Sequence, residues 1–185
     1  MCSGHVLSIV WRLSSCLGLA FCLSCSGEGA SITSPATGGI TSDSAFFALV
    51  TQTEPFGLYT LFPNLAGNTT GILSGSSAHQ PRIRVSMNAK AFGVLQNGRL
   101  PSGTTFPDGS IVFKEVLATS GVTSIYTVMY KDRSNSLAGS GWLWAEYRPG
   151  GGTEYSVTNR GGACTGCHSL DQGPQNDFVR SFERQ

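Results

Sequence analysis

Charged residues are scarce in this chain of 185 residues. Asp, Glu, Lys and Arg make up 12% of it, and the 12 Lys and Arg nearly balance the 11 Asp and Glu. No run of basic residues occurs, so a nucleic-acid-binding protein that follows the phosphate backbone is not expected. No apolar run reaches the roughly 20 residues that a membrane-spanning helix needs. The length suits one ordinary domain and a tail.

Cysteine is absent from the whole stretch between Cys25 and Cys164. Four of the six cysteines lie within the first 25 residues, and the other two are Cys164 and Cys167. A disulfide-stabilised domain would distribute its cysteines through the fold. The pattern instead predicts a leader followed by one local cysteine site.

Residues 1–25 are expected to form a signal peptide, because residues 13–23 (LSSCLGLAFCL) form an apolar core of the usual length. Cleavage is either ordinary or of the lipoprotein type, with the lipid on Cys25 or, since LSSC is the better lipobox sequence, on Cys16. Residues 26–44 are rich in Ser, Thr, Gly and Ala and are expected to form a flexible tether. These segments predict a periplasmic protein, either free or anchored to the membrane by lipid. The remaining alternative is a cytosolic protein with a chance apolar start.

Residues 45–185 are expected to form one domain of the mainly β (α+β) class, an antiparallel sheet with a few short helices. Four segments have the alternation or the β-branched and aromatic content of strands: residues 82–87, 110–116, 124–130 and 141–147. Short helices are expected at residues 45–53 and 89–97. Turn sequences at residues 106–109 (FPDG) and 149–152 (PGGG) favour local connections between strands.

Residues 164–168 (CTGCH) have the CxxCH pattern of c-type haem attachment. Two thiols three positions apart can bond to the two vinyl groups of one haem, and the histidine that follows can ligate the iron. Cys164 and Cys167 are therefore predicted to hold one haem c covalently, with His168 as the axial ligand. The alternatives are a disulfide between the two cysteines, or part of a metal site completed by carboxylates. Export favours haem, since c-type haem is attached outside the cytoplasm.

Six segments, taken in order, resemble the cytochrome P-460 family, which is related to cytochrome c′-beta. They are residues 82–88 (RIRVSMN), 106–116 (FPDGSIVFKEV), 128–132 (VMYKD), 141–147 (GWLWAEY), 164–169 (CTGCHS) and 177–179 (DFV). The resemblance implies a mostly antiparallel β fold, usually a homodimer, with one c-type haem. It also implies five-coordinate iron, with His168 on the proximal side and an open distal side.

The resemblance assigns roles to further residues. Lys114 in the segment FKE matches the lysine that cytochromes P-460 cross-link to the haem macrocycle, although related proteins keep the haem without this bond. The family's distal arginine falls on Arg84, or on Arg82 if the register shifts by two, and would bind an iron ligand or a propionate. The alternatives are a lysine at a strand edge and an arginine on an exposed strand.

The distal glutamate of the hydroxylamine-oxidising members lies four residues before the lysine that corresponds to Lys131, and the position is Thr127 here. A threonine cannot act as a carboxylate base. Glu115 and Glu146 are other carboxylates, but nothing in the sequence places them on the distal side. His79 is expected in a solvated loop.

These observations predict an exported monohaem protein that binds or oxidises a small nitrogen species, hydroxylamine or nitric oxide, and passes electrons to a partner cytochrome. Its activity would then resemble that of a hydroxylamine oxidoreductase. One alternative is a non-catalytic binder of nitric oxide or carbon monoxide of the cytochrome c′-beta type, which Thr127 favours. Another is a six-coordinate electron-transfer cytochrome c, with Met87 or Met129 as sixth ligand. Nucleic acid is not an expected partner, and a membrane is expected only through the lipid anchor.

Overall fold

The computed structural model describes residues 39–62 and 70–184. The expected signal peptide, residues 1–25, lies outside the described residues, and so does most of the expected tether, residues 26–44. Among the helices of the described residues, none has the length and apolar content that crossing a membrane requires.

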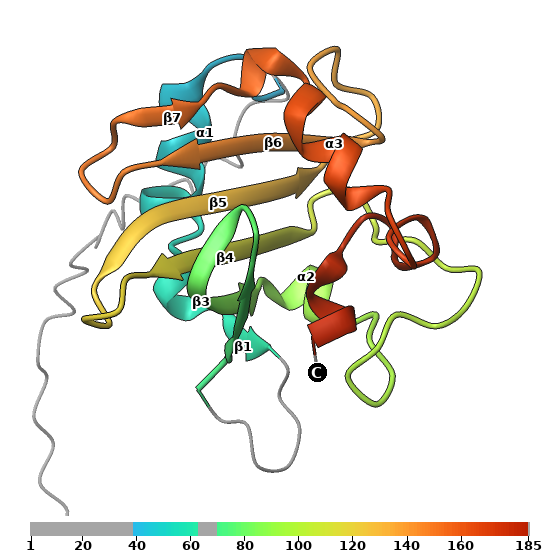
Figure 1. Ribbon diagram of the computed structural model, residues 1–185. Helices are drawn as coiled ribbons and strands as arrows, with labels where there is room; N and C mark the ends of the chain where they lie inside the picture. Colours follow the sequence, from blue (N-terminus) through green and yellow to red (C-terminus); the bar gives the residue numbers. More distant parts are fainter. Residues whose placement is uncertain (1–38, 63–69, 185) are drawn as a thin grey trace, which may run out of the picture. The chain divides into compact units, whose positions relative to one another are not determined.

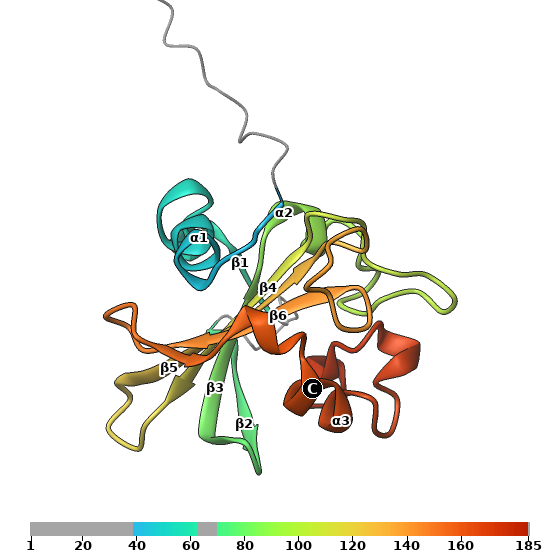
Figure 2. The same cartoon turned by 90° about the horizontal axis from the view of Figure 1, so that it is seen from above.

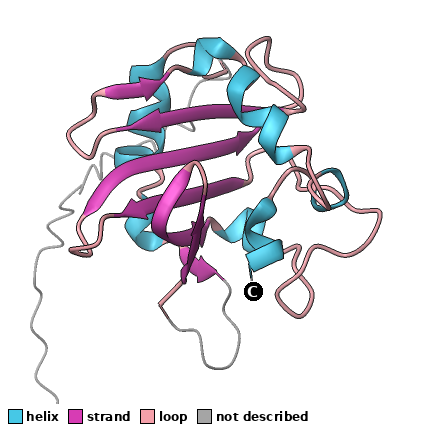
Figure 3. Ribbon diagram, viewed as in Figure 1, coloured by secondary structure: helices cyan, strands magenta, loops and turns pink. Residues whose placement is uncertain are grey.

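One antiparallel sheet of seven strands dominates the described part of the chain (Figures 1 and 3). The strands are β1 (Thr60–Phe62), β2 (Ile72–Ser76), β3 (His79–Met87), β4 (Ile111–Leu117), β5 (Thr123–Lys131), β6 (Trp142–Tyr147) and β7 (Thr153–Tyr155). Their order across the sheet is β1-β3-β4-β5-β6-β7, and β2 also pairs with β3. From β3 to β7, strands that follow one another in the sequence are therefore neighbours in the sheet.

The helices are short and lie on both sides of the sheet. They are α1 (Asp43–Ala48), the π-helical turn η1 (Leu49–Thr53), η2 (Phe56–Leu58), α2 (Ala89–Phe92), η3 (Val157–Asn159), α3 (Gly162–His168), η4 (Pro174–Asn176) and η5 (Arg180–Arg184). Seen from above, α1 and α3 lie on opposite sides of the sheet (Figure 2). The predicted fold class, an antiparallel sheet with a few short helices, is confirmed.

Side-chain caps explain where two of the helices begin. The hydroxyl of Ser42 accepts a hydrogen bond from the backbone N–H of Ala45 and caps α1, which begins two residues before the domain start expected at residue 45. Asn88 caps α2 by accepting from the backbone N–H of Ala91. The same Asn88 oxygen accepts from the backbone N–H of Ile111, so this cap also joins α2 to the start of β4.

Alternation along the strands gives the sheet two apolar faces, here called the α1 face and the α3 face. The α1 face is covered by α1 and η1, and its buried residues include Ile111, Phe113, Val128 and Leu143 with Phe46 and Val50. The α3 face meets the C-terminal segment, and its buried residues include Val85, Val112, Met129 and Trp144 with Val179 and Phe182. The two cores therefore lie on either side of the same strands.

A buried ion pair holds the C-terminal segment on the sheet. Nζ of Lys131 on β5 lies 2.6 Å from Oδ1 of Asp177, and the two side chains are only 3% and 6% exposed. The backbone N–H of Phe106 donates to the second carboxylate oxygen of Asp177, and the indole N–H of Trp142 donates to its carbonyl. Burial lowers the pKa of Lys131, while the contact with Asp177 acts in the opposite direction.

Candidate functional site

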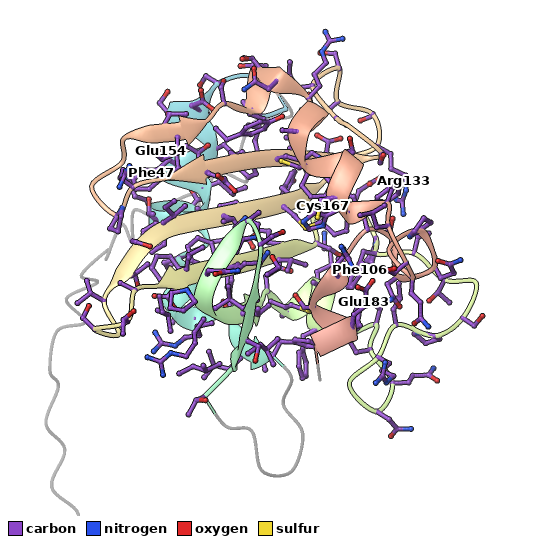
Figure 4. All side chains as sticks on the ribbon, viewed as in Figure 1. Phe47, Phe106, Arg133, Glu154, Cys167 and Glu183 are labelled. Atoms are coloured by element: carbon purple, nitrogen blue, oxygen red, sulfur yellow. The ribbon has the colours of Figure 1, made fainter. Side chains whose placement is uncertain are left out.

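A cavity of about 250 Å³ lies on the α3 face, between the strands and α3. Its walls combine residues of β4, β5 and β6 with residues of α3, among them Lys114, Thr127, Trp144, Cys164, Cys167 and His168. Figure 4 marks Cys167 on α3. The structure therefore brings Lys114 into the same cavity as the three residues of the CxxCH motif, although 50 or more positions separate them in the sequence.

Gly161 allows α3 to begin directly beside the sheet. Its φ of 69° lies in the left-handed region that favours glycine. A Cβ atom at this position would lie only 2.6 Å from Nε1 of Trp144. The carbonyl of Gly161 accepts hydrogen bonds from the backbone N–H and the hydroxyl of Thr165, which closes the first turn. The glycine before the motif thus sets the close approach of α3 to β6.

His168 at the end of α3 is held by the backbone of the segment that follows. Its Nδ1 lies 2.6 Å from the carbonyl oxygen of Phe178, so Nδ1 carries a hydrogen and donates it. The ring packs edge-on against Trp144, with 4.8 Å between the centroids. Burial, followed by the nearby charge of Lys114, lowers the pKa of His168 to about 4. The imidazole is therefore neutral at neutral pH, with Nε2 as the nitrogen available to a metal.

Cys164 and Cys167 are both free thiols and both line the cavity. Burial raises the pKa of Cys164 to about 11, and the carboxylate of Glu146 acts in the same direction. The guanidinium of Arg180 donates to the carbonyl of Cys167 and lies 3.6 Å from its sulfur. Two unpaired thiols and a neutral, oriented imidazole on one cavity fit the attachment of a single c-type haem.

Lys114 belongs to a polar row that crosses three strands on the α3 face. It pairs with Thr127 of β5, and Thr127 pairs with Glu146 of β6. Residues directly opposite each other in an antiparallel ladder share one face of the sheet. His79 of β3 joins the two ends of this row, with Nε2 at 3.0 Å from Oε1 of Glu146 and Nδ1 at 3.4 Å from Nζ of Lys114.

Arg84 does not join these residues. It alternates along β3 with Ile83 and Val85, which belong to the core of the α3 face, and so it lies on the opposite face. There its guanidinium pairs with Glu115 at 3.1 Å. Arg82, two residues earlier in the same strand, has the same orientation. The structure therefore separates both arginines from the cavity that holds Lys114 and His168.

Sequence reasoning missed His79 and Glu146 as cavity residues. The expected solvated loop at His79 is wrong, because His79 is the first residue of β3, pairs with Ser76 of β2 and has a side chain only 15% exposed. For Glu146 a signal was present, since Trp142, Trp144 and Glu146 follow one another at the two-residue spacing of a shared strand face. Of the two methionines considered as iron ligands, Met129 lines the cavity and Met87 does not.

The alternative of a metal site completed by carboxylates lacks a complete ligand set in the described ranges 39–62 and 70–184. No group of three or more His, Cys, Asp and Glu there could hold a metal ion. The disulfide alternative is also not realised, since Cys164 and Cys167 are not joined.

Comparison with known proteins identifies the family. No match was found among curated proteins. A family model described as cytochrome P460 matches residues 76–181, more than half of the chain, and this range includes both sides of the cavity. Membership implies a haem cofactor, which agrees with the thiols and the imidazole on the cavity wall. The chain belongs to the cytochrome P460 family.

Proposed function

We propose that this protein is a c-type haem protein that binds or oxidises a small nitrogen compound, hydroxylamine or nitric oxide, in the cavity beside α3. The observation that carries the proposal is the convergence of Cys164, Cys167, His168 and Lys114 on that one cavity. Membership of the cytochrome P460 family supports haem as the cofactor.

In this proposal Cys164 and Cys167 hold the haem, and His168 provides the iron ligand through Nε2. The haem, when bound, supplies the redox and ligand-binding chemistry. The residues around His168 control the orientation and the protonation state of the proposed iron ligand. The hydrogen bond from His168 to the Phe178 carbonyl fixes the ring and makes Nε2 a better electron donor. Burial against Trp144 keeps the imidazole neutral.

Lys114 is proposed to be cross-linked to the haem, as the matching lysine is in cytochromes P-460. Its place on the wall of the cavity that Cys167 and His168 also line supports this role. Arg84 is left out of the proposed distal site, because it pairs with Glu115 on the α1 face.

A second function is favoured by Thr127. This residue lines the cavity, is 9% exposed and carries no group that titrates near neutral pH. A non-catalytic protein that captures nitric oxide or carbon monoxide needs no base at this position. Such a binder would share the haem attachment proposed above and differ only in lacking turnover.

The same proposal has three further parts. The protein is exported to the periplasm, with or without a lipid anchor. It forms a homodimer, and it passes electrons to a partner cytochrome. Export is supported by the apolar leader in the sequence, and the other parts by the family resemblance.

The test is the optical spectrum of the ferrous protein, made in a host that attaches haem c. A strongly red-shifted Soret band that survives denaturation, and is lost in Lys114→Arg, is expected if Lys114 modifies the macrocycle. An ordinary five-coordinate high-spin spectrum without hydroxylamine turnover would instead support the gas binder. A six-coordinate low-spin spectrum would contradict the open distal site, and the absence of covalent haem would overturn the proposal.

A further inference from the structure

Three titratable side chains from three strands form one hydrogen-bonded chain along the cavity. Lys114 comes from β4, His79 from β3 and Glu146 from β6, with 3.4 Å between Lys114 Nζ and His79 Nδ1 and 3.0 Å between His79 Nε2 and Glu146 Oε1. All three residues line the cavity. The side chains of His79 and Glu146 are 15% and 27% exposed, so the pair is largely shielded but keeps a route to solvent at Glu146.

This arrangement gives the two nitrogens of His79 different tasks. Nε2 carries its hydrogen toward the Glu146 carboxylate, which orients the ring and stabilises a positive charge on it. Nδ1 is then the basic nitrogen, held on the cavity side by a long contact with Lys114. A carboxylate behind an imidazole that faces a reaction space is the usual arrangement for accepting a proton. The other charged or titratable groups along the cavity are Tyr155, Cys164, Cys167, His168 and Arg180.

We propose that His79, supported by Glu146, is the proton acceptor for ligands that enter the cavity. The bond between the ligand's acidic atom and its hydrogen breaks, and its electron pair stays on the ligand. The proton forms a new bond with Nδ1 of His79 in place of the hydrogen bond from Lys114. Nε2 keeps its hydrogen and donates it to Glu146. No electron is transferred in this step, and the positive charge gained by the ring is balanced by the carboxylate.

Thr127 is the middle residue of the polar row and does not compete for the proton. It lies between Lys114 and Glu146 in the same row, and its hydroxyl cannot hold the proton near neutral pH. The carboxylate of this row is Glu146, one strand further along on β6, and it contacts His79 of β3. Glu146 acts through His79, so it is a positioning residue and His79 is the group expected to meet the ligand.

The inference rests on the proposed function, because it requires haem in the cavity, and its test compares two probes of the holoprotein. Hydrogen cyanide binds ferric haem as the anion and must give up a proton, whereas carbon monoxide binds ferrous haem without any proton transfer. The variants are His79→Gln and Glu146→Gln. The matched control is Glu115→Gln, which removes a carboxylate from β4, the strand of Lys114, on the opposite face of the sheet. Association rates are measured by stopped-flow absorbance.

We expect His79→Gln to slow cyanide association by about 100-fold, the lower range for loss of a general base. Glu146→Gln is expected to slow it by about 10-fold, as for loss of a residue that orients another. Carbon monoxide association should stay within about 2-fold in both variants, and Glu115→Gln should leave both rates unchanged. Equal slowing of the two probes would overturn the inference, since it would mean that these residues control access to the cavity.

The outcomes separate the two proposals. If covalent haem is absent from the wild-type protein, the proposed function fails. If haem is attached and both probes bind, but cyanide association is the same in wild type, His79→Gln and Glu146→Gln, the proposed function stands and the proton acceptor lies elsewhere.

Discussion

Nδ1 of His168 donates to the carbonyl oxygen of Phe178 across 2.6 Å, and the residue before Phe178 is Asp177 of the buried ion pair. Asp177 and Phe178 both have positive φ, at 49° and 67°, a conformation that costs energy for residues other than glycine. The contacts of Asp177 with Lys131, Phe106 and the sheet hold this backbone in place. The orientation of the proposed iron ligand therefore depends on an ion pair in the core.

Removing one partner of the Lys131–Asp177 pair should destabilise the folded protein. Lys131→Met leaves the Asp177 carboxylate buried without its cation, and we expect the free energy of unfolding to fall by about 3–5 kcal/mol. Urea denaturation followed by tryptophan fluorescence measures it. As a control, Arg148→Gln removes an exposed partner of Glu154 and should leave the midpoint nearly unchanged. Similar midpoints for the two variants would show that the buried pair does not stabilise the fold.

Two glycines beside the CxxCH motif should respond differently to the same substitution. Gly161→Ala forces a left-handed backbone on alanine and pushes its methyl group against Trp144, so a loss of about 1–3 kcal/mol or more is expected. Gly166→Ala meets nothing within 4 Å and lies inside a helix, so it should be neutral or stabilising by up to about 1 kcal/mol. Thermal or urea unfolding of the haem-free protein tests both. Equal effects would contradict the close contact at Gly161.

The haem-free protein should lose stability in mild acid because of His168. Its pKa is about 4 when folded, whereas an exposed histidine titrates near 6.5. Between these values the unfolded chain binds a proton that the folded chain does not, so stability is complete above pH 6.5 and falls toward pH 4, by up to about 3 kcal/mol. Urea unfolding at several pH values measures the slope. His168→Gln should flatten it, and an unchanged slope in that variant would assign the effect to other groups.

Each of the two thiols should contribute its own covalent bond to the haem. With Cys164→Ala or Cys167→Ala one thioether bond remains, so haem should stay with the denatured chain while the spectrum of its pyridine complex changes. The double variant should keep covalent haem only through the proposed Lys114 bond, and adding Lys114→Arg should remove covalent haem altogether. His168→Met should keep the covalent bonds but change the axial ligation seen in the ferrous spectrum. Covalent haem that remains after all three substitutions would mean that a further residue bonds to the haem.

The central strands could be predicted because their side chains alternate or are β-branched and aromatic, as in residues 124–130. Strands β1, β2 and β7 were missed, since they are short, lie at or next to the sheet edges and gain their order from pairing with longer neighbours. The helix expected at residues 89–97 ends at Phe92, which shows how weakly propensity fixes a helix end.

The haem-attachment role of the CxxCH residues could be predicted because the motif lies within five consecutive residues. The rest of the cavity could not be predicted, because it depends on which face of each strand the α3 segment covers. Arg84 and Lys114 illustrate this. Both are cations on β strands that pair with each other, yet Lys114 lies opposite Val85 on the α3 face, and Arg84 lies opposite Glu115 on the α1 face. The alternation is visible in the sequence, whereas the choice of face requires the tertiary fold.

The row from Lys114 through Thr127 to Glu146 also depends on the register between the strands that carry it. Side chains alternate between the two faces, so a slip of one residue between β5 and β6 would carry Glu146 to the α1 face and bring a neighbouring residue to the cavity. Insertions in the turns leave the row intact as long as the strands keep this register. A one-residue slip of β6 would also carry Trp144 to the α1 face and Leu143 to the α3 face, so the polar row and both apolar cores depend on the same register.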